Sequence, residues 1–455
     1  MKMNWLSMAV TLPVVVLLML GAACSRSDRS AQSWSLPKPV SIAGGKDWAE
    51  VFPSGSQWLS RSADGGVAGL LLHDGDLILA GIPTVYRTSD GPALKMESND
   101  WSVRLAGKVV SLSLKDGKEG REWLNHAPAQ DLTAVRLLVL PNGSDAALLQ
   151  ALKPMAALNP GVALMAESNA VLCQVLPLFR PRVLILGDKA LDTAGGEIVG
   201  AHQQIETLVM SGEEAGSLAV LPRLHGLRQL TIISWDVEKA GPLPAGVVRL
   251  RSIVVSGSNM KDLSAFDAAP AGVEEVSLIA CGNLTDVSGL ARLPALKTVI
   301  LDGSEKVLAL QGLAGLRQLQ WMGLPPKISK GQFGSFVQAH PDLRILEMVG
   351  CDDVTDLAPL RGLANLEGLI LTGRSSNLEV VPTLKSLRFV GVSTEVFKKS
   401  PEQVMAIQKA LPDALVVPVS GLCLGSGWIL LLIPAVGAAM LLTRRRRTAV
   451  GSRRG

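Results

Sequence analysis

The chain has 455 residues, of which 44 are Lys or Arg and 40 are Asp or Glu, giving a formal net charge of +4. This length has room for two or three domains. Without Lys2 and the arginines of the C-terminal tail (444–455), acidic residues slightly outnumber basic ones, which argues against a nucleic-acid-binding protein. The five cysteines, two of them in terminal segments, are too few for a disulfide framework.

Residues 1–24 have the pattern of a secretory signal peptide. Lys2 precedes an apolar run over residues 5–20, and small residues then lead to Cys24. A Cys after small residues resembles a bacterial lipoprotein processing site, which implies lipidation of Cys24. Ordinary cleavage after Ala23 and an uncleaved anchor remain the alternatives.

Residues 25–130 are predicted to form a polar tether followed by a small β-rich domain. Short apolar runs alternate with Asp-Gly pairs, which favour hairpin turns because both residues tolerate positive φ. The pairs lie at 64–65, 74–75, 90–91 and 116–117. Four tryptophans are available for the core of this domain: Trp48, Trp58, Trp101 and Trp123. The domain could also cap the open end of the segment that follows.

Residues 131–415 contain a phrase that recurs about every 23 residues: an apolar residue, two variable residues, a second apolar residue, one variable residue and a third apolar residue. The phrase opens at Ile205, Leu227, Leu250, Val273, Leu296, Leu316, Leu343, Leu366 and either Leu384 or Leu387. The last two apolar positions are two apart, so they face the same side of a strand. One such strand cannot bury its apolar side alone, and stacked copies would form a parallel sheet with a continuous core.

These repeats resemble the leucine-rich-repeat family, in particular the short-repeat, internalin-like bacterial class. The likeness rests on the recurring phrase and on two Thr-Asp-containing return segments at 284–293 and 354–363. It continues weakly upstream at 135–141 and 182–188. The resemblance implies an α/β solenoid with a parallel sheet on its concave face and helices or turns on its convex face. The alternative is an ordinary α/β domain with Leu-rich strands.

The C-terminal end predicts a membrane anchor. Residues 400–417 suggest a capping helix, begun by Ser400 and Pro401, and a return to strand; 416–421 would be a stem. The apolar residues 422–443 are long enough for a transmembrane helix, and the Arg-rich tail 444–455 would stay in the cytoplasm. The body would then lie outside the cytoplasm, in the periplasm or at the cell surface. Residues 421–427, with Cys423, also resemble a bacterial sorting signal that is cleaved.

The sequence contains no motif that predicts catalysis, a cofactor or a metal site. Nucleophile elbows, phosphate loops and metalloprotease motifs are absent, and the five histidines have no ligand spacing. The resemblance therefore favours a non-enzymatic protein that recognises a protein ligand or acts as a scaffold at the cell envelope. Two other functions stay open: a structural envelope tether, and a catalytic or sugar-binding N-terminal domain with the repeats as a spacer.

The predicted partner-binding residues point out of the sheet between the core positions. They are aliphatic or sulfur-containing and would form an exposed apolar surface on the concave face. They are Val209, Val254, Ile279, Ile300, Met322, Val349 and Ile370. The alternative is that a lid, a neighbouring copy or the N-terminal domain covers this face.

Overall fold

The computed structural model describes residues 57–419 apart from several short gaps. The gaps are 62–69, 74–75, 80–84, 88–92, 99–100, 106–107, 116–117, 136, 188–190, 373–377 and 413. The predicted signal peptide with Cys24, the membrane helix at 422–443 and the Arg-rich tail lie outside the described residues. Within those residues, no helix has the length and hydropathy needed to span a bilayer.

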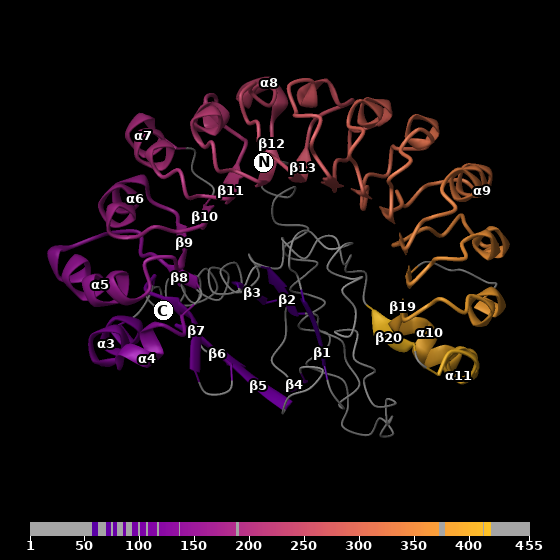
Figure 1. Ribbon diagram of the computed structural model, residues 1–455, viewed down its shortest axis with the longest axis horizontal. Helices are drawn as coiled ribbons and strands as arrows, with labels where there is room; N and C mark the ends of the chain where they lie inside the picture. Colours follow the sequence, from indigo (N-terminus) through magenta and orange to yellow (C-terminus); the bar gives the residue numbers. More distant parts are fainter. Residues whose placement is uncertain are drawn as a thin grey trace, which may run out of the picture.

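Parallel strands line the inner side of an arch, and helices and turns follow its outer side (Figure 1). Parallel pairing runs without interruption from β7 to β20. The strands are β7 (Lys108–Ser113), β8 (Leu137–Val139), β9 (Ala163–Ala166), β10 (Val183–Leu186), β11 (Thr207–Ser211), β12 (Gln229–Trp235), β13 (Ser252–Ser258), β14 (Glu275–Ile279), β15 (Thr298–Ile300), β16 (Trp321–Gly323), β17 (Ile345–Met348), β18 (Gly368–Leu371), β19 (Phe389–Ser393) and β20 (Leu415–Val419).

Equivalent residues of successive repeats stand opposite one another. Leu230 of β12 lies opposite Leu208 of β11 on one side and Ile253 of β13 on the other. All three are fully buried, and they belong to a single apolar cluster that extends from Val109 to Val416. The core therefore sits between the sheet and the return segments, as the repeat phrase predicts, and each strand is stable only beside its neighbours.

The return segments on the convex side are short helices and 3-10 turns. The α-helices are α3 (Lys118–His126), α4 (Ala129–Leu132), α5 (Ala146–Leu158), α6 (Asn169–Val175), α7 (Thr193–Ala201), α8 (Val237–Ala240), α9 (Lys330–Ala339), α10 (Thr394–Lys399) and α11 (Pro401–Ala410). The 3-10 turns are η2 (Leu176–Leu178), η3 (Ser217–Arg223), η4 (Ser264–Phe266), η5 (Ser288–Arg292), η6 (Gln311–Leu313), η7 (Ala358–Gly362) and η8 (Leu378–Thr383).

Polar side chains start many of these turns by accepting a backbone N–H bond. Asp145, Asp192 and Ser329 accept from Leu148, Gly195 and Gln332 at the starts of α5, α7 and α9. Asp286 and Asp356 do the same before η5 and η7. A side-chain acceptor satisfies an N–H that has no partner at a helix start, so these residues fix where the chain turns back toward the next strand.

The repeat at β16 corrects the predicted register. Its phrase opens at Leu319 and not at Leu316, because Met322 pairs with Val299 of β15 and Leu346 of β17. The step from Leu296 becomes 23 residues, so the apparent 20- and 27-residue steps disappear. Leu316 ends the preceding turn, where it is also buried. For the last repeat, the pairing of β19 selects Leu387 as the opening over Leu384.

Before β7 the strands pair in antiparallel fashion. They are β1 (Gln57–Arg61), β2 (Leu70–His73), β3 (Asp76–Leu79), β4 (Val85–Arg87), β5 (Ala93–Ser98) and β6 (Ser102–Leu105). The pairs are β1–β2, β2–β3, β1–β4, β4–β5, β5–β6 and β6–β7. Strands β2 and β3 pair in antiparallel fashion on either side of residues 74–75, as a hairpin there requires, although the predicted turn itself lies outside the described residues. The hairpin predicted at 116–117 is wrong, because β7 is followed by α3 and pairs in parallel with β8.

The N-terminal strands and the solenoid share one sheet. Strand β7 pairs with β6 on one side and with β8 on the other, so this sheet crosses the predicted domain boundary at residue 130. The rings of Trp101 and Trp123 are tilted by 41° with centroids 6.2 Å apart, and both pack against the solenoid core. Two of the tryptophans assigned to a separate β-domain core therefore contribute to the edge of the solenoid.

The C-terminal end of the described chain adds one more repeat. Helix α11 begins at Pro401 as predicted, but the Ser400 side chain makes no capping bond; its carbonyl accepts from the Gln403 and Val404 N–H groups instead. Strand β20 then pairs with β19 in parallel. It takes in residues 416–419 of the predicted stem, which are part of the sheet.

The convex turns pack tightly enough to test by substitution. A Cβ at Gly312 in η6 would lie 2.5 Å from the Ser288 Cα, whereas one at Gly315 would meet nothing within 4 Å. We expect Gly312→Ala to destabilise the fold by about 1 to 3 kcal/mol, because neighbouring backbone must move apart. Thermal unfolding of the full chain measures this. Gly315→Ala serves as the control, and equal melting temperatures for the two variants would contradict the packing.

Candidate binding surface

Three rows of side chains point to the concave side of the sheet, because they alternate with the core positions along each strand. The inner row contains Thr207, Gln229, Ser252, Glu275, Thr298, Trp321 and Ile345. The middle row contains Val209, Thr231, Val254, Ser277, Ile300, Gly323, Glu347 and Ile370. The outer row, nearest the strand ends, contains Ser211, Ile233, Ser256, Ile279, Asp302, Pro325, Val349 and Thr372.

The inner row is a buried polar ladder that the sequence analysis did not identify. The Thr207 hydroxyl donates to Gln229 Oε1 at 2.7 Å, and the Ser252 hydroxyl donates to Glu275 Oε2 at 2.8 Å. Each bond joins neighbouring strands. The strand period itself could have found this row, because these residues alternate with the core residues in the same way as the middle row.

A second carboxylate lies further along the sheet. The Trp321 Nε1–H of the inner row donates to Glu347 Oε1 of the middle row at 2.7 Å. Glu347 is fully buried. A buried carboxylate without partners is strongly destabilising, so Glu347 must keep this hydrogen bond in the folded state. The bond fixes the orientations of the indole and the carboxylate relative to each other.

Burial raises the pKa of Glu275 to about 7, and the hydrogen bond from Ser252 only partly opposes that shift. The cause is the loss of water around the charged form. The carboxyl therefore changes its charge close to neutral pH.

The middle row, which mixes aliphatic and polar residues, is buried and not exposed. Val209 and Val254 belong to a cluster with Ile185, Met165 and Val139 of the preceding strands. Adjacent strands lie only about 4.8 Å apart, so neighbouring side chains shield each other.

Six of the seven residues predicted for binding do face the concave side, but most of them are buried. Val209, Val254, Ile300 and Ile370 are at most 1% exposed, which corrects the expected exposed surface. Ile279 and Val349 of the outer row are partly exposed.

Met322 was assigned to the wrong side of the sheet. It is fully buried in the main core between β15 and β17. The error follows from opening this repeat at Leu316 and not at Leu319. The two openings differ by an odd number of residues, and an odd shift moves each side chain to the opposite face of the sheet. Gly323 occupies the concave middle position, where a Cβ would lie 3.0 Å from Ile300 Cγ2.

The outer row is the part of the concave sheet with accessible side chains. Ile233, Ile279 and Val349 are partly exposed, and the polar Ser256, Asp302 and Thr372 alternate with them along the arch. The parallel ladder holds the backbones of Ile233, Ser256 and Ile279, whereas Asp302, Val349 and Thr372 lie just after the ends of strands β15, β17 and β18. Apolar side chains with interspersed polar groups on a rigid surface suit contact with a protein partner.

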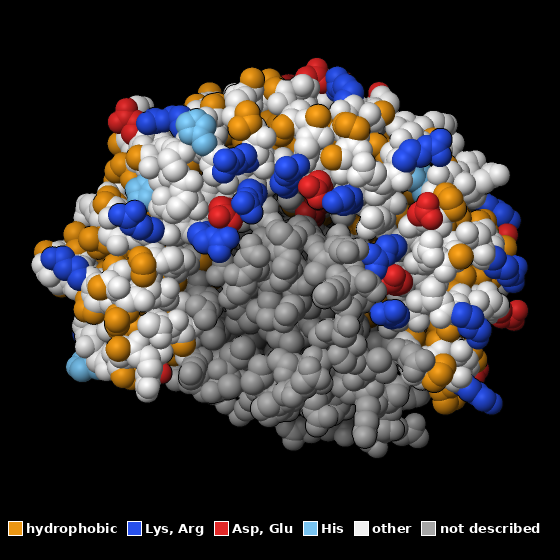
Figure 2. Space-filling view, viewed as in Figure 1, with side chains coloured by type: hydrophobic (Ala, Val, Ile, Leu, Met, Phe, Trp, Pro, Cys, Tyr) orange, Lys and Arg blue, Asp and Glu red, His pale blue; other side chains and the backbone are white. Residues whose placement is uncertain are grey.

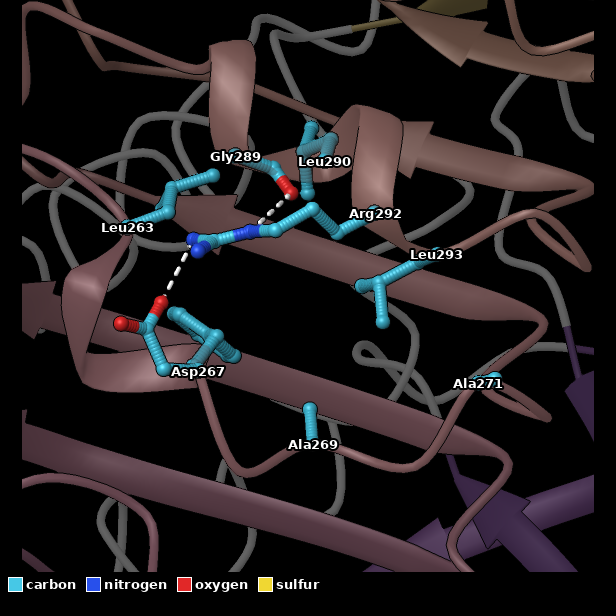
Figure 3. Close-up of a pocket in the computed structure, with 9 residues that line it drawn as sticks. Leu263, Asp267, Ala269, Ala271, Gly289, Leu290, Arg292 and Leu293 are labelled. Carbon is cyan, nitrogen blue, oxygen red and sulfur yellow. Dashed lines mark hydrogen bonds and ion pairs between the residues drawn. The ribbon is translucent and has the colours of Figure 1, made fainter.

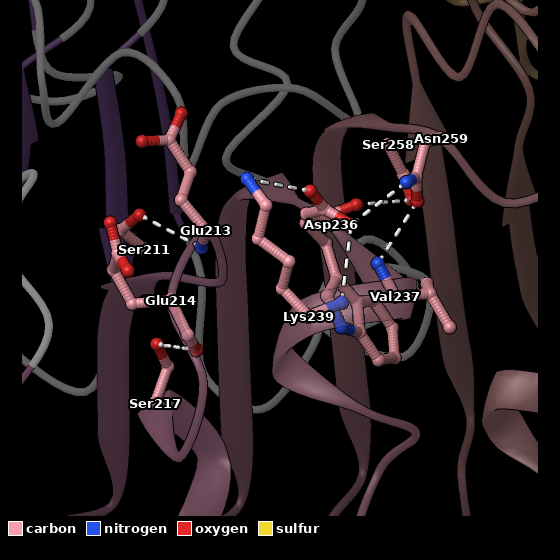
Figure 4. Close-up of polar contacts among 10 residues, drawn as sticks. Ser211, Glu213, Glu214, Ser217, Asp236, Val237, Lys239, Ser258 and Asn259 are labelled. Carbon is pink, nitrogen blue, oxygen red and sulfur yellow. Dashed lines mark hydrogen bonds and ion pairs between the residues drawn. The ribbon is translucent and has the colours of Figure 1, made fainter.

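Beyond the outer row, the strand-exit loops carry a polar network (Figure 4). Asp236 accepts from Asn259 Nδ2 at 2.9 Å and lies 3.2 Å from Lys239 Nζ, while Asn259 Oδ1 accepts from the Val237 N–H. Burial raises the pKa of Asp236, but its hydrogen bonds with Lys239 and Asn259 outweigh this and lower it overall. The network joins the two exit loops that carry Asp236 and Asn259.

A small pocket of about 100 Å³ lies on the convex side between η4 and η5 (Figure 3). Leu263, Phe266 and Leu290 line it, and Arg292 crosses it to reach Asp267 at 2.6 Å. Ligand pockets for small molecules usually measure about 300 Å³ or more. We therefore interpret this pocket as the space between two consecutive turns.

The cysteines and other potential ligands of the described residues give no sign of a metal or redox site. Cys281 and Cys351 are free and buried, and burial raises the pKa of each thiol to about 12. Ser304 occupies the same loop position in another repeat, where its hydroxyl donates to the Leu278 carbonyl at 2.9 Å. Within the described ranges, no group of three His, Cys, Asp or Glu residues could hold a metal ion.

The repeat phrase, the parallel register and the convex turns together define the fold. The described chain is an α/β solenoid of stacked repeats, the architecture that the resemblance to leucine-rich-repeat proteins implied. No family model matches the chain, and no curated protein matches it.

Several solved structures are similar to the chain at low sequence identity. Internalin F of Listeria monocytogenes is 16% identical over 66% of this chain and 94% of its own, with a TM-score of 0.41. Internalin C2 of the same organism is 22% identical over 43% of this chain and 84% of its own, with a TM-score of 0.34. A leucine-rich-repeat protein of Leptospira interrogans is 12% identical over 67% of this chain and 99% of its own, with a TM-score of 0.25. At these TM-scores, the likenesses carry no argument about function.

The Glu275 carboxyl predicts a pH dependence of stability. Its pKa is about 7 in the folded chain against an ordinary value of 4.5. Between these values the folded state keeps a proton that the unfolded state releases, so the free energy of unfolding falls as pH rises from about 4.5 to about 7. In the parent chain, this fall in the free energy of unfolding should be on the order of 2 to 3 kcal/mol. We expect the fall to be absent in Glu275→Gln, because the amide does not titrate.

Denaturant unfolding of the full chain at pH 5 and pH 8 measures this effect. The matched control is Glu238→Gln at an exposed site, which should leave the pH dependence of the parent chain in place. An unchanged slope in Glu275→Gln would show that Glu275 does not cause it.

Proposed function

We propose that this protein is a non-enzymatic recognition module whose outer concave row binds a protein partner. The observation that carries the proposal is the row of partly exposed aliphatic residues, Ile233, Ile279 and Val349, on a rigid parallel sheet. Such residues can lose water on binding, while Ser256 and Asp302 supply polar contacts beside them. The buried inner and middle rows would support this surface without touching the partner.

The proposed location is the cell envelope, with the solenoid outside the cytoplasm. The terminal sequences support it: a lipoprotein-like signal ends at Cys24, and the apolar segment 422–443 precedes an Arg-rich tail. Since β20 ends at Val419, only a few residues separate the last repeat from the predicted membrane helix. The C-terminal end of the arch would then stand close to the membrane.

The binding proposal is tested by placing charge in the outer row. We expect the variant Ile233→Asp, Ile279→Asp, Val349→Asp to lose a specific cross-linked partner in intact cells, because a charge in an apolar contact must be desolvated. The measurement is cross-linking of the full chain followed by identification of the captured proteins. A photoreactive residue at position 279 should capture the same partner directly.

The matched control places charges at exposed apolar residues away from the concave sheet. Val248 and Leu308 are 70% and 58% exposed, and Val248→Asp with Leu308→Asp should leave capture intact. If the control variant loses the partner as readily as the outer-row variant, or if neither loses it, the outer row is not the binding site.

A further inference from the structure

The two edges of the arch carry opposite charge. The strand-entry edge is formed by the residues immediately before the inner row. Its basic members are Arg182, Arg228, Arg251, Lys297, Arg344 and Arg388. Three acidic residues, Glu206, Glu274 and Glu367, stand in the same position of the intervening repeats. Figure 2 looks onto the plane of the arch and shows Lys and Arg side chains gathered along the inner rim of one face.

Each of these glutamates is neutralised by an entry-edge base. Glu206 lies 2.7 Å from Arg182, Glu274 lies 2.9 Å from Lys297, and Glu367 lies 2.9 Å from Arg344. Arg228 and Arg388 are exposed. Arg251 also lies 3.5 Å from Glu274, so four of the six bases pair with the three glutamates. Six bases against three acids still leave the edge with a net charge of +3.

The strand-exit edge has the opposite sign. Acidic residues there follow the outer row in the loops that leave the sheet. They include Glu213, Glu214, Asp236, Glu305, Asp352 and Asp353, and they outnumber the lysines of the same loops, Lys239, Lys261, Lys306 and Lys327. Lys239 pairs with Asp236, and Lys306 donates to Asn283. In Figure 4 the Glu213 and Glu214 side chains extend from the exit loop beside the Asp236 network.

Helix electrostatics explains part of this separation. Every convex turn begins at the exit edge and ends at the entry edge, so an acidic start and a basic end suit each turn dipole. Asp286 starts η5, and Arg223, Arg292 and Arg361 stand in the last turns of η3, η5 and η7. Arg228, Arg388, Glu214 and Asp353 lie outside these turns, so capping does not account for them.

We propose that a second copy of this chain docks its strand-exit edge on the strand-entry edge of the first. The two edges belong to one arch, so they share its curvature and the same repeat spacing. A row of bases at that spacing therefore meets a row of acids at the same spacing. Such a contact joins two different surfaces and leaves one free edge on each copy, so it continues from copy to copy as a string unless the rotation between copies closes a ring.

The proposed anchor is compatible with this arrangement. If the C-terminal end of the arch stands on the membrane, both edges face sideways, toward neighbouring copies in the same membrane. The contact uses neither the outer row nor the concave face. The experiment on self-association can therefore fail while the proposal of partner binding stands, and the reverse also holds.

Charge reversal on each edge tests the proposal. The entry variant carries Arg228→Glu, Arg251→Glu and Arg388→Glu, and the exit variant carries Glu214→Lys, Glu305→Lys and Asp353→Lys; all six side chains are exposed. Sedimentation velocity of the purified full chain in detergent would be recorded at low salt and at about 0.5 M salt, where exposed charges are screened. Thermal unfolding checks that each variant is folded.

We expect the parent chain to form concentration-dependent strings at low salt that dissociate at high salt. Each variant alone should self-associate on the order of tenfold more weakly, because its two edges then have the same sign. An equimolar mixture of the two variants should associate again, since one supplies acidic edges and the other basic edges. A parent chain that stays monomeric at low salt, a variant that still self-associates, or a mixture of folded variants that does not recover association would overturn the proposal.

Discussion

The parallel register of the strands is the constraint on which the rest of the structure depends. Each repeat supplies one short strand whose apolar side is buried only because an equivalent strand lies on either side of it. The same register places equivalent residues in rows across the arch. Side chains alternate between the two faces of each strand, so one set of rows forms the core and the other set faces the concave side. A given position of the repeat therefore lies on the same face of the sheet in every repeat.

A local interaction that recurs in successive repeats also determines the character of a whole surface of the arch. A hydroxyl that donates to a carboxylate on the next strand becomes part of a buried polar ladder, as Ser252 and Glu275 show. An aspartate that starts a convex turn, such as Asp286, places one negative charge near the strand-exit edge. Because all repeats run in the same direction, these contributions do not cancel, and the arch acquires an outer row of alternating aliphatic and polar residues and two edges of opposite charge.

The sequence predicted the solenoid, its parallel sheet and most strand positions, because the apolar spacing is set by the strand period. The prediction from sequence was wrong about the start of a repeat where two nearby apolar residues fit the same pattern. Leu316 and Leu319 are both buried, and only the pairing of Met322 with Val299 decides which one opens the repeat. It also failed for Val209 and Ile300, because their exposure depends on neighbouring strands and not on their own spacing. The inner row was predictable from strand alternation, but the polarity of Gln229 and Glu275 is unlike that of a conventional apolar binding surface.

Register is tested most directly by deleting one repeat in two different phases. Removal of residues 296–318 places Leu319 where Leu296 stands, and removal of 296–315 places Leu316 there instead. We expect the first deletion to give a chain with cooperative thermal unfolding, since β14 can then pair with β16 in phase. We expect the second deletion to lose cooperative unfolding, because its strand presents the wrong face to the core. If the second variant unfolded cooperatively and the first did not, the register that opens the β16 repeat at Leu319 would be contradicted.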